Sequence, residues 1–206
     1  MSQLFLASSA DYVLNDIVKH LSNKPSEYNL AFINTAAEIM KGGNHWWVAK
    51  EKNKLLSVGF QVDEFSITKL SQSELESKMA DKNGIYICGG NTYYLLDQVI
   101  KTGFNKFLKK WIEEGKLYIG SSAGSMIVGI DIDLIPSDEA HSAPGLKSRG
   151  LGIIDLAIVP HWGSSDFRDE YLKDISSLYR ENAKIILLSN SQYLHVRGDT
   201  YSINQV

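Results

Sequence analysis

The run Gly120-Ser121-Ser122-Ala123-Gly124 has the residue types of a nucleophile turn. The apolar residues before it predict a strand, and the apolar residues after it predict a helix. In the Gly-x-Ser-x-Gly turn of hydrolases the serine lies at a sharp strand-to-helix junction, with its hydroxyl exposed beside the positive end of the helix. The pattern therefore predicts Ser122 as a nucleophile. The alternative is a small-residue crossing between a strand and a helix, which any α/β protein can contain.

A serine hydroxyl becomes a good nucleophile only when a base accepts its proton, so the histidines are the next candidates. His161 follows an apolar run that predicts a strand, and Pro160 stiffens the backbone just before it. We expect His161 to be the general base, and the alternative is a structural histidine at a strand end. The remaining histidines are weaker candidates for this role: His20, His45, His141 and His195.

The oxyanion of an acyl transfer needs two converging backbone N–H groups. Ala123, directly after the serine, supplies one of them in the geometry of the nucleophile turn. Gly89-Gly90-Asn91 follows another predicted strand, and a glycine backbone can approach a ligand closely. We expect the second N–H to come from this segment. A phosphate-binding loop or a plain tight turn is the alternative for these glycines.

Short runs of β-forming residues alternate with longer stretches of helical periodicity along the chain. This alternation predicts an α/β fold, with a mainly parallel sheet and helices on both of its faces. Active sites of such sheets lie at the carboxyl ends of the strands, so the loops that carry Asn34, Gly89, Ser122 and His161 should converge. The predicted strands are 4–7, 30–34, 58–62, 85–88, 117–121, 157–159 and 185–189, the predicted helices are 11–21, 46–56, 72–79, 92–101, 103–114, 125–129 and 167–182, and a hairpin is expected at 192–197 and 200–203.

Length and composition restrict the class of protein. The 206 residues fit a single domain over 1–206, and 44% hydrophobic with 22% charged residues is typical of a globular chain. A net charge of −3 with scattered lysines argues against a surface for nucleic acid or for a membrane. The N-terminus has neither a signal peptide nor a membrane span, and the single Cys88 allows no internal disulfide, so a cytoplasmic protein is expected.

The same composition bears on cofactors and partners. No metal-ligand spacing is present among the histidines, acids and the one cysteine, so no metal or cofactor is expected. Trp46 and Trp47 fit either a core helix or a dimer face, which leaves a monomer and a homodimer as alternatives.

Three blocks of sequence occur together in this chain: Gly89-Gly90-Asn91-Thr92, Gly120-Ser121-Ser122-Ala123-Gly124 and Val159-Pro160-His161-Trp162. With these blocks the chain resembles the S51 serine peptidases, a family that includes aspartyl dipeptidases and cyanophycinase, over most of its length. The resemblance implies a three-layer α/β sandwich like that of class I glutamine amidotransferases, with serine in place of the cysteine at the turn. It also implies that Ser122 attacks the scissile carbonyl, that His161 is the general base, and that Gly90 and Ala123 supply the oxyanion N–H groups.

The third catalytic position departs from the pattern of that family. The family has an acidic residue after the strand predicted at 185–189, and Asn190 occupies that position here. An amide oxygen orients an imidazole but does not stabilise its cation as a carboxylate does. Asp133, in the segment after the serine turn, is the leading substitute for the missing acid.

The second departure concerns the substrate. Aspartyl dipeptidases must pair the side-chain carboxylate of an N-terminal Asp with a cation. They have a more basic segment after the histidine, where this chain keeps one arginine, Arg168. A bidentate contact from Arg168 to a substrate carboxylate is one interpretation, and a helix-start arginine paired with a neighbouring acid is the other. Asn91 is the other candidate substrate-binding residue.

The resulting hypothesis is a serine peptidase that cleaves short peptides through an acyl-enzyme. Its more specific version is a dipeptidase that acts on peptides with an N-terminal Asp. The alternative is an inactive family member that binds a small ligand in the retained pocket, because Asn190 weakens the support of the base. A lipase-type hydrolase also fits the serine turn taken alone. Amidotransferase chemistry is nearly excluded, because Cys88 precedes the Gly-Gly turn and the nucleophile position has serine.

Overall fold

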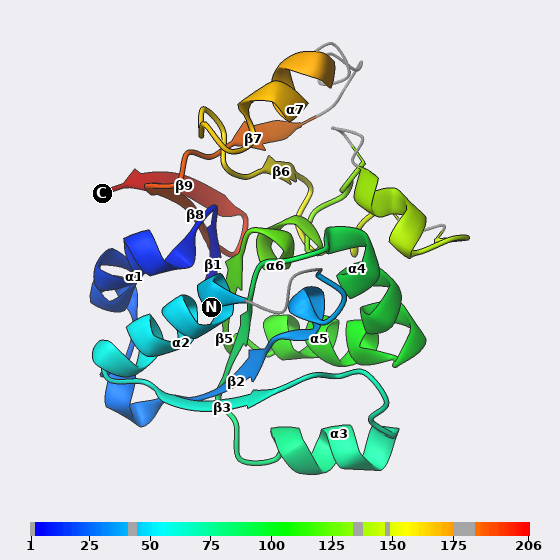
Figure 1. The fold of residues 1–206 in the computed structure, drawn as a ribbon. Helices are drawn as coiled ribbons and strands as arrows, with labels where there is room; N and C mark the ends of the chain where they lie inside the picture. Colours follow the sequence, from blue (N-terminus) through cyan, green and yellow to red (C-terminus); the bar gives the residue numbers. More distant parts are fainter. Residues whose placement is uncertain (1–2, 41–44, 134–137, 147–148, 175–183) are drawn as a thin grey trace.

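Seven strands form the central sheet of the computed structural model, which describes residues 3–40, 45–133, 138–146, 149–174 and 184–206 (Figure 1). The strand order is β3-β2-β4-β5-β1-β8-β9. The first five strands are parallel to one another, β8 is antiparallel to β1, and β9 is antiparallel to β8. The bounds are β1 (Gln3–Ala7), β2 (Asn29–Ile33), β3 (Gln61–Phe65), β4 (Gly84–Ile87), β5 (Leu117–Ser121), β8 (Gln192–Arg197) and β9 (Thr200–Gln205).

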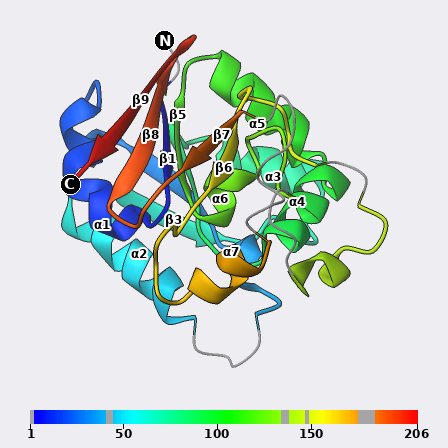
Figure 2. The same ribbon diagram turned by 90° about the horizontal axis from the view of Figure 1, so that it is seen from above.

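A second, two-stranded parallel sheet is formed by β6 (Ala157–Val159) and β7 (Ile185–Leu187). The helix α7 (Arg168–Asp174) packs on it through Tyr171, which contacts Ala157 and Val159 in a small apolar cluster. Figures 1 and 2 show this small sheet and α7 lying above the end of the large sheet where α6 begins.

Helices cover both faces of the large sheet, and the two faces have separate apolar cores. On one face lie α1 (Ala10–Ile17) and α2 (Trp46–Ser57), and on the other lie α3 (Gln72–Met79), α4 (Thr92–Lys101), α5 (Phe104–Glu113) and α6 (Ala123–Met126). Short 3-10 helices occur at Val18–His20, Pro25–Glu27, Thr35–Ala37 and Asp138–Ser142.

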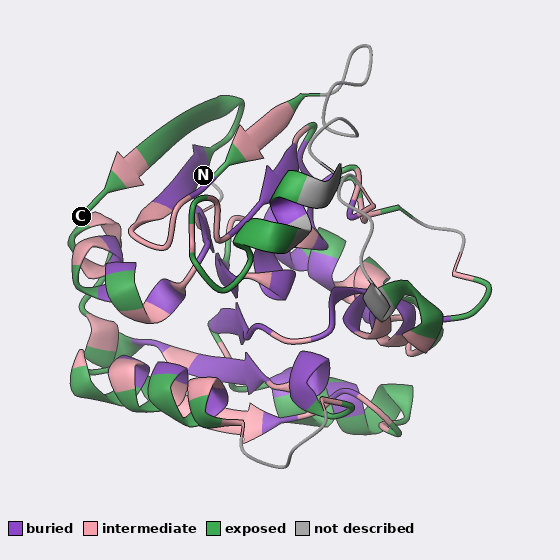
Figure 3. Cartoon of the chain, turned by 45° about the horizontal axis from the view of Figure 1, so that its top comes forward, coloured by how far each residue is buried: buried purple, intermediate pink, exposed green. Residues whose placement is uncertain are grey.

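Alternating side chains of each central strand enter the two cores. In β1, Phe5 packs toward α1 and α2, whereas Leu4 and Leu6 pack toward the opposite helices. Burial on both faces explains why the inner parallel strands β1, β2, β4 and β5 are mostly apolar, and Figure 3 shows these strands as largely buried while β9 at the edge is mostly exposed. Within the described residues, no helix combines the length and apolarity needed to cross a membrane.

The predicted fold class, a mainly parallel sheet between two layers of helices, is confirmed. The strand predicted at 58–62 is wrong in position, because α2 continues to Ser57 and β3 begins only at Gln61. Gly59 has a φ of 105°, and the N–H of Phe60 bonds the carbonyl of Leu55, which is the Schellman ending of a helix. Part of the helix predicted at 167–182 lies outside the described residues, and the described part runs from 168 to 174.

Candidate active site

Ser122 is the single residue between β5 and α6. Its φ of 49° and ψ of −110° are unusual for an L-residue, and such backbone strain is typical of functional sites. The turn is tight enough to require both flanking glycines. A Cβ on Gly124 would lie 2.3 Å from the carbonyl oxygen of Ile87, and one on Gly120 would lie 2.7 Å from the backbone of Gly124. The sequence around Ser122 therefore forms the strained strand-to-helix turn that it predicts.

Ser122, His161 and Asn190 form one hydrogen-bonded chain. The Oγ of Ser122 lies 2.9 Å from Nε2 of His161, and Nδ1 of His161 lies 2.7 Å from Oδ1 of Asn190. Because Oδ1 can only accept, Nδ1 has the proton in this arrangement and Nε2 is free to accept the proton of the serine. The arrangement has the connectivity of a nucleophile, a base and an orienting group.

Ser8 connects the base to its orienting residue. The Ser8 hydroxyl accepts the backbone N–H of His161 at 2.7 Å and donates to Oδ1 of Asn190 at 3.2 Å. It is fully buried and directly follows β1, the strand between β5 and β8. In this orientation of the amide, Oδ1 of Asn190 accepts from Ser8 and faces Nδ1 of His161.

The surroundings of His161 keep its imidazole neutral. Burial lowers the pKa of His161 below the usual value of 6.5, and the hydrogen bond to Asn190 and the charges of Asp166 and Asp11 oppose this only in part. The ring also stacks on Phe167, with centroids 4.5 Å apart. A neutral imidazole at neutral pH is the form that accepts a proton.

Of the two predicted oxyanion donors, Ala123 lies at this turn, and Gly90 lies in the segment after β4 that approaches it. Ala123 is the first residue of α6, so its N–H has no partner within the helix. A Cβ on Gly89 would lie 3.2 Å from Cβ of Ser122, which shows how closely the Gly89-Gly90 backbone approaches the serine. The indole N–H of Trp47 donates to the carbonyl of Gly89 at 3.1 Å and fixes that peptide.

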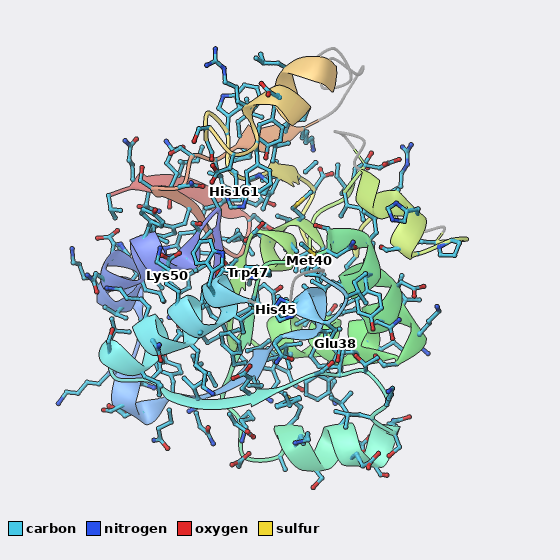
Figure 4. The ribbon with its side chains drawn as sticks, in the orientation of Figure 1. Glu38, Met40, His45, Trp47, Lys50 and His161 are labelled. Carbon is cyan, nitrogen blue, oxygen red and sulfur yellow. The ribbon has the colours of Figure 1, made fainter. Side chains whose placement is uncertain are left out.

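These groups open into a cavity of about 470 Å³. Ser122, His161 and Asn190 line it together with Gly89 and Gly90. Figure 4 shows Trp47 and Lys50 of α2 below His161, and both also line the cavity. The volume suits a small ligand.

Several residues singled out from the sequence do not line this cavity. Asn91 caps α4 by accepting the N–H of Tyr94 at 2.8 Å. The carboxylate of Asp133 accepts the hydroxyl of Tyr93 at 2.6 Å, and Arg168 is exposed at the start of α7.

Other positions considered from the sequence are also outside the cavity lining. Asn34, expected in a converging loop, donates to Glu64 at the end of β3. The remaining histidines, His20, His45, His141 and His195, do not line the cavity either. Within the part of the chain that is described, no group of three or more His, Cys, Asp or Glu side chains is placed to hold a metal ion.

Sequence reasoning missed Ser8, Asp11 and Glu51, all of which line the cavity. Ser8 and Asp11 follow the first predicted strand, so the rule that sites lie at strand ends could have included them. Glu51 lies inside a predicted helix, and nothing in its sequence neighbourhood distinguishes it from a solvated charge.

The model of peptidase family S51 matches residues 4–204 of this chain. The chain belongs to peptidase family S51. Among the relatives of this S51 peptidase, an uncharacterized peptidase of Pasteurella multocida is 32% identical over 205 residues, which covers 97% of this chain and 96% of the relative. An uncharacterized peptidase of Listeria monocytogenes is 32% identical over 200 residues, with 96% of each chain covered.

Solved structures support the same assignment for the S51 peptidase. A crystal structure described as a candidate Peptidase E from Listeria monocytogenes superposes with a TM-score of 0.89 at 30% identity and covers 100% of this chain and 99% of that chain. A peptidase from an acI-B1 Actinobacterium, 20% identical with a TM-score of 0.74, covers 100% of this chain and 88% of its own and shares the fold. The fold is class I glutamine amidotransferase-like, and the S51 chain is a peptidase, a hydrolase of peptide bonds.

Proposed function

We propose that this chain is a serine peptidase that hydrolyses short peptides through an acyl-enzyme on Ser122. The observation that carries the proposal is the continuous chain of Ser122, His161 and Asn190 at hydrogen-bond distances of 2.9 and 2.7 Å. A hydroxyl in contact with a neutral imidazole, itself oriented by a third group, is the arrangement that activates serine.

The reaction follows from the positions of the groups. His161 Nε2 removes the proton of Ser122 as Oγ attacks the scissile carbonyl, and the N–H groups of Ala123 and Gly90 bind the oxyanion that forms. The imidazolium then gives its proton to the departing amine, which leaves an ester on Ser122. His161 next deprotonates a water molecule, which hydrolyses this ester and restores the serine.

Asn190 orients the imidazole in this reaction, but its neutral amide supplies no negative charge to pair with the imidazolium. The tautomer is correct because Oδ1 accepts from Nδ1. The cation that forms in the transition state is therefore stabilised less than it would be by a carboxylate. Asp133, the substitute considered from the sequence, is held by Tyr93 outside the cavity lining, which supports Asn190 as the third member.

The more specific version of this proposal is that the peptidase prefers substrates with an N-terminal Asp. It needs a cation at the substrate side chain, and Arg168, the candidate from the sequence, is exposed and is not part of the cavity lining. Hydrolysis of Asp-Leu and Ala-Leu by the wild-type protein tests the preference. A higher kcat/KM for Asp-Leu supports it, and equal or lower values reject it.

Fluorophosphonate labelling followed by peptide mapping tests the peptidase mechanism itself. We expect the label on Ser122, and we expect His161→Ala to prevent it, because the hydroxyl then lacks its base. Ser202→Ala, a serine substitution on the exposed strand β9, is the matched control and should label normally. Absence of label under conditions that modify a control serine peptidase rejects the proposal and leaves a ligand-binding family member as the alternative.

A further inference from the structure

An aromatic ring lies nearly parallel to the imidazole of the proposed base. The ring centroids of His161 and Phe167 are 4.5 Å apart, and the two ring planes are inclined by 11°. Phe167 is 36% exposed and lines the cavity. Figure 4 shows His161 beneath α7, the helix that begins directly after Phe167. One face of the imidazole is therefore covered by a phenyl ring.

Two turns of backbone bring Phe167 over the ring of His161. The N–H of Ser164 donates to the carbonyl of His161 at 2.9 Å, and the N–H of Phe167 donates to the carbonyl of Ser164 at 3.4 Å. Gly163 has a φ of 78°, a left-handed conformation that glycine adopts without strain. The contact between the rings thus follows from the fold of the segment between β6 and α7.

Tyr171 holds both ends of this segment. It follows Phe167 by four residues, so the two rings lie on one face of the helical turn, with centroids 6.2 Å apart. Tyr171 is buried, and its hydroxyl donates to the carbonyl of Pro160, the residue before His161. The N–H of His161 is held by Ser8. The positions of both stacked rings are therefore fixed by their neighbours.

The ring nitrogens of His161 contact uncharged groups. Nε2 contacts the hydroxyl of Ser122, and Nδ1 contacts the amide oxygen of Asn190. The carboxylates that act on His161 are Asp166, which precedes α7, and Asp11 on α1, and their charges compensate for the burial of the ring only in part. The imidazolium that forms during acyl transfer therefore needs stabilisation from a further group.

The face of an aromatic ring can supply this stabilisation. Its π electrons attract a cation that lies within about 6 Å of the ring centroid. The imidazole of His161 lies within this range of Phe167. The neutral imidazole has no charge to be attracted, so the attraction grows as the base takes the proton of the serine. An interaction that is stronger in the transition state than in the ground state raises kcat.

We propose that the ring of Phe167 stabilises the imidazolium of His161 in the transition state, and that it supplies part of the support that the neutral Asn190 does not give. Phe167 acts through His161 and is therefore a positioning residue. The inference rests on the proposed peptidase function for the transition state, but the attraction to a protonated His161 exists in the free protein as well.

Proton NMR titration of the free protein tests this attraction without turnover. The Cε1–H signal of His161 is identified by its absence in His161→Ala, and its shift with pH gives the pKa of His161. Phe167→Leu keeps an apolar cover over the imidazole but removes the aromatic face. We expect this substitution to weaken the binding of the proton by about 2- to 5-fold, so that the pKa of His161 falls.

A second aromatic residue and a distant phenylalanine serve as comparisons in the same titration. Phe167→Trp should hold the pKa of His161 at or above its wild-type value, because the face of tryptophan attracts cations most strongly. Phe107→Leu is the matched control, because Phe107 stacks on Phe104 and Trp111 outside the cavity lining, and it should leave the pKa of His161 unchanged. An unchanged or raised pKa of His161 in Phe167→Leu would overturn the proposal, since loss of a ring that merely excludes water does not lower this pKa.

Steady-state kinetics on a short peptide at about pH 8, where His161 is neutral in all variants, give the effect on the reaction. Phe167→Leu should lower kcat several-fold and leave KM nearly unchanged, because the lost attraction belongs to the transition state. Phe167→Tyr, the conservative variant, should retain the wild-type kcat. A raised KM with an unchanged kcat in Phe167→Leu would overturn the proposal, because Phe167 would then act only as a wall for the substrate.

The outcomes separate this proposal from the peptidase mechanism. Fluorophosphonate labelling of Ser122 combined with an unchanged pKa of His161 in Phe167→Leu overturns the role of Phe167 alone. Failure of that labelling combined with a lowered pKa of His161 in Phe167→Leu overturns the mechanism and supports the attraction between Phe167 and the protonated His161.

Discussion

At position 190 an amide takes the place of the carboxylate that orients the histidine in a Ser-His-Asp arrangement. Asn190 still accepts from His161, and Ser8 holds it in the correct orientation. The missing charge and the burial of the ring act in the same direction, since both keep the imidazole neutral. The site is therefore built to operate with a weakly basic histidine.

The pH dependence of kcat/KM follows from this environment. The neutral form of His161 is the active base, so the rate constant should rise with pH and level off above the pKa of His161. Burial places this pKa below the usual 6.5. Steady-state kinetics between about pH 5 and 8 should give a midpoint below that of free histidine. A midpoint above 6.5 would contradict the buried, uncharged surroundings described for the ring.

Asn190→Asp should restore the missing charge. A carboxylate next to Nδ1 stabilises the imidazolium, so the pKa of His161 should rise and kcat at alkaline pH should increase several-fold. The measurement is the pH profile of kcat/KM, in which the midpoint moves upward. Asn204→Asp on β9 is the matched control and should leave the profile unchanged. An unchanged midpoint of the pH profile in Asn190→Asp would contradict the contact between residue 190 and the base.

The sequence predicts Ser122 and His161 from residue types and from the strand ends that precede them. It does not predict Ser8, because a serine after β1 gains its role only from the position of β1 between β5 and β8. That strand order depends on contacts between distant segments, and no local pattern encodes it. Glu51 was missed for a similar reason, since helical periodicity shows which face is buried but not which loop it meets.

The element that most affects the oxyanion site is α2. Trp47 of this helix donates its indole N–H to the carbonyl of Gly89. That carbonyl and the N–H of Gly90 belong to the same trans peptide and point in opposite directions. By holding the carbonyl, Trp47 sets the direction of the N–H, which makes it a positioning residue for the proposed oxyanion donor.

Trp47→Phe should therefore lower kcat more than it raises KM. Loss of one oxyanion donor costs about 10²- to 10³-fold in kcat, and a loosened donor should cost roughly 10-fold. Trp111→Phe is the matched control, because the indole of Trp111 also bonds a backbone carbonyl, that of Leu117, and neither residue lines the cavity. Steady-state kinetics on a short peptide give the comparison. A rise in KM with kcat unchanged would mean that Trp47 only shapes the cavity.

For the whole molecule, the ionisation of the buried Glu51, which lines the cavity, affects the free energy of unfolding. Burial raises the pKa of Glu51 from 4.5 to about 7, and the hydrogen bond from Ser121 opposes this only in part. The facing titratable groups are Asp11 on α1, Tyr86 on β4 and Cys88, which directly follows β4. The pKa values of Tyr86 and Cys88 are raised by burial, so both remain neutral near pH 7. Ionising Glu51 in this setting is unfavourable for the folded state.

The contribution of Glu51 to the free energy of unfolding should therefore fall as the pH rises from about 4.5 through 7 and then level off. The folded protein binds the Glu51 proton more tightly than the unfolded chain does, and the loss amounts to about 3 kcal/mol. Denaturant titrations of the wild type and of Glu51→Gln at several pH values give the difference. The stability advantage of Glu51→Gln should grow across this pH range. A constant difference between the two proteins would contradict a buried, ionising carboxyl group.

The arrangement of layers could be predicted because apolar runs and helical stretches alternate along the whole chain. The boundary between α2 and β3 could not, since Val58, Gly59 and Phe60 also suit a strand until the helix ending is seen. The small sheet of β6 and β7 was predicted as strands but not as a separate sheet. Which strands pair is a property of the complete molecule.

The proposed peptidase reaction requires a covalent ester between Ser122 and the acyl half of the substrate. Rapid acid quenching of the protein with leucine p-nitrophenyl ester, followed by mass spectrometry of the intact chain and its peptides, detects that ester directly. We expect a leucyl adduct on Ser122 that is absent from Ser122→Ala and strongly reduced in His161→Ala. An adduct on a different residue, or turnover of the ester without any adduct, would contradict it.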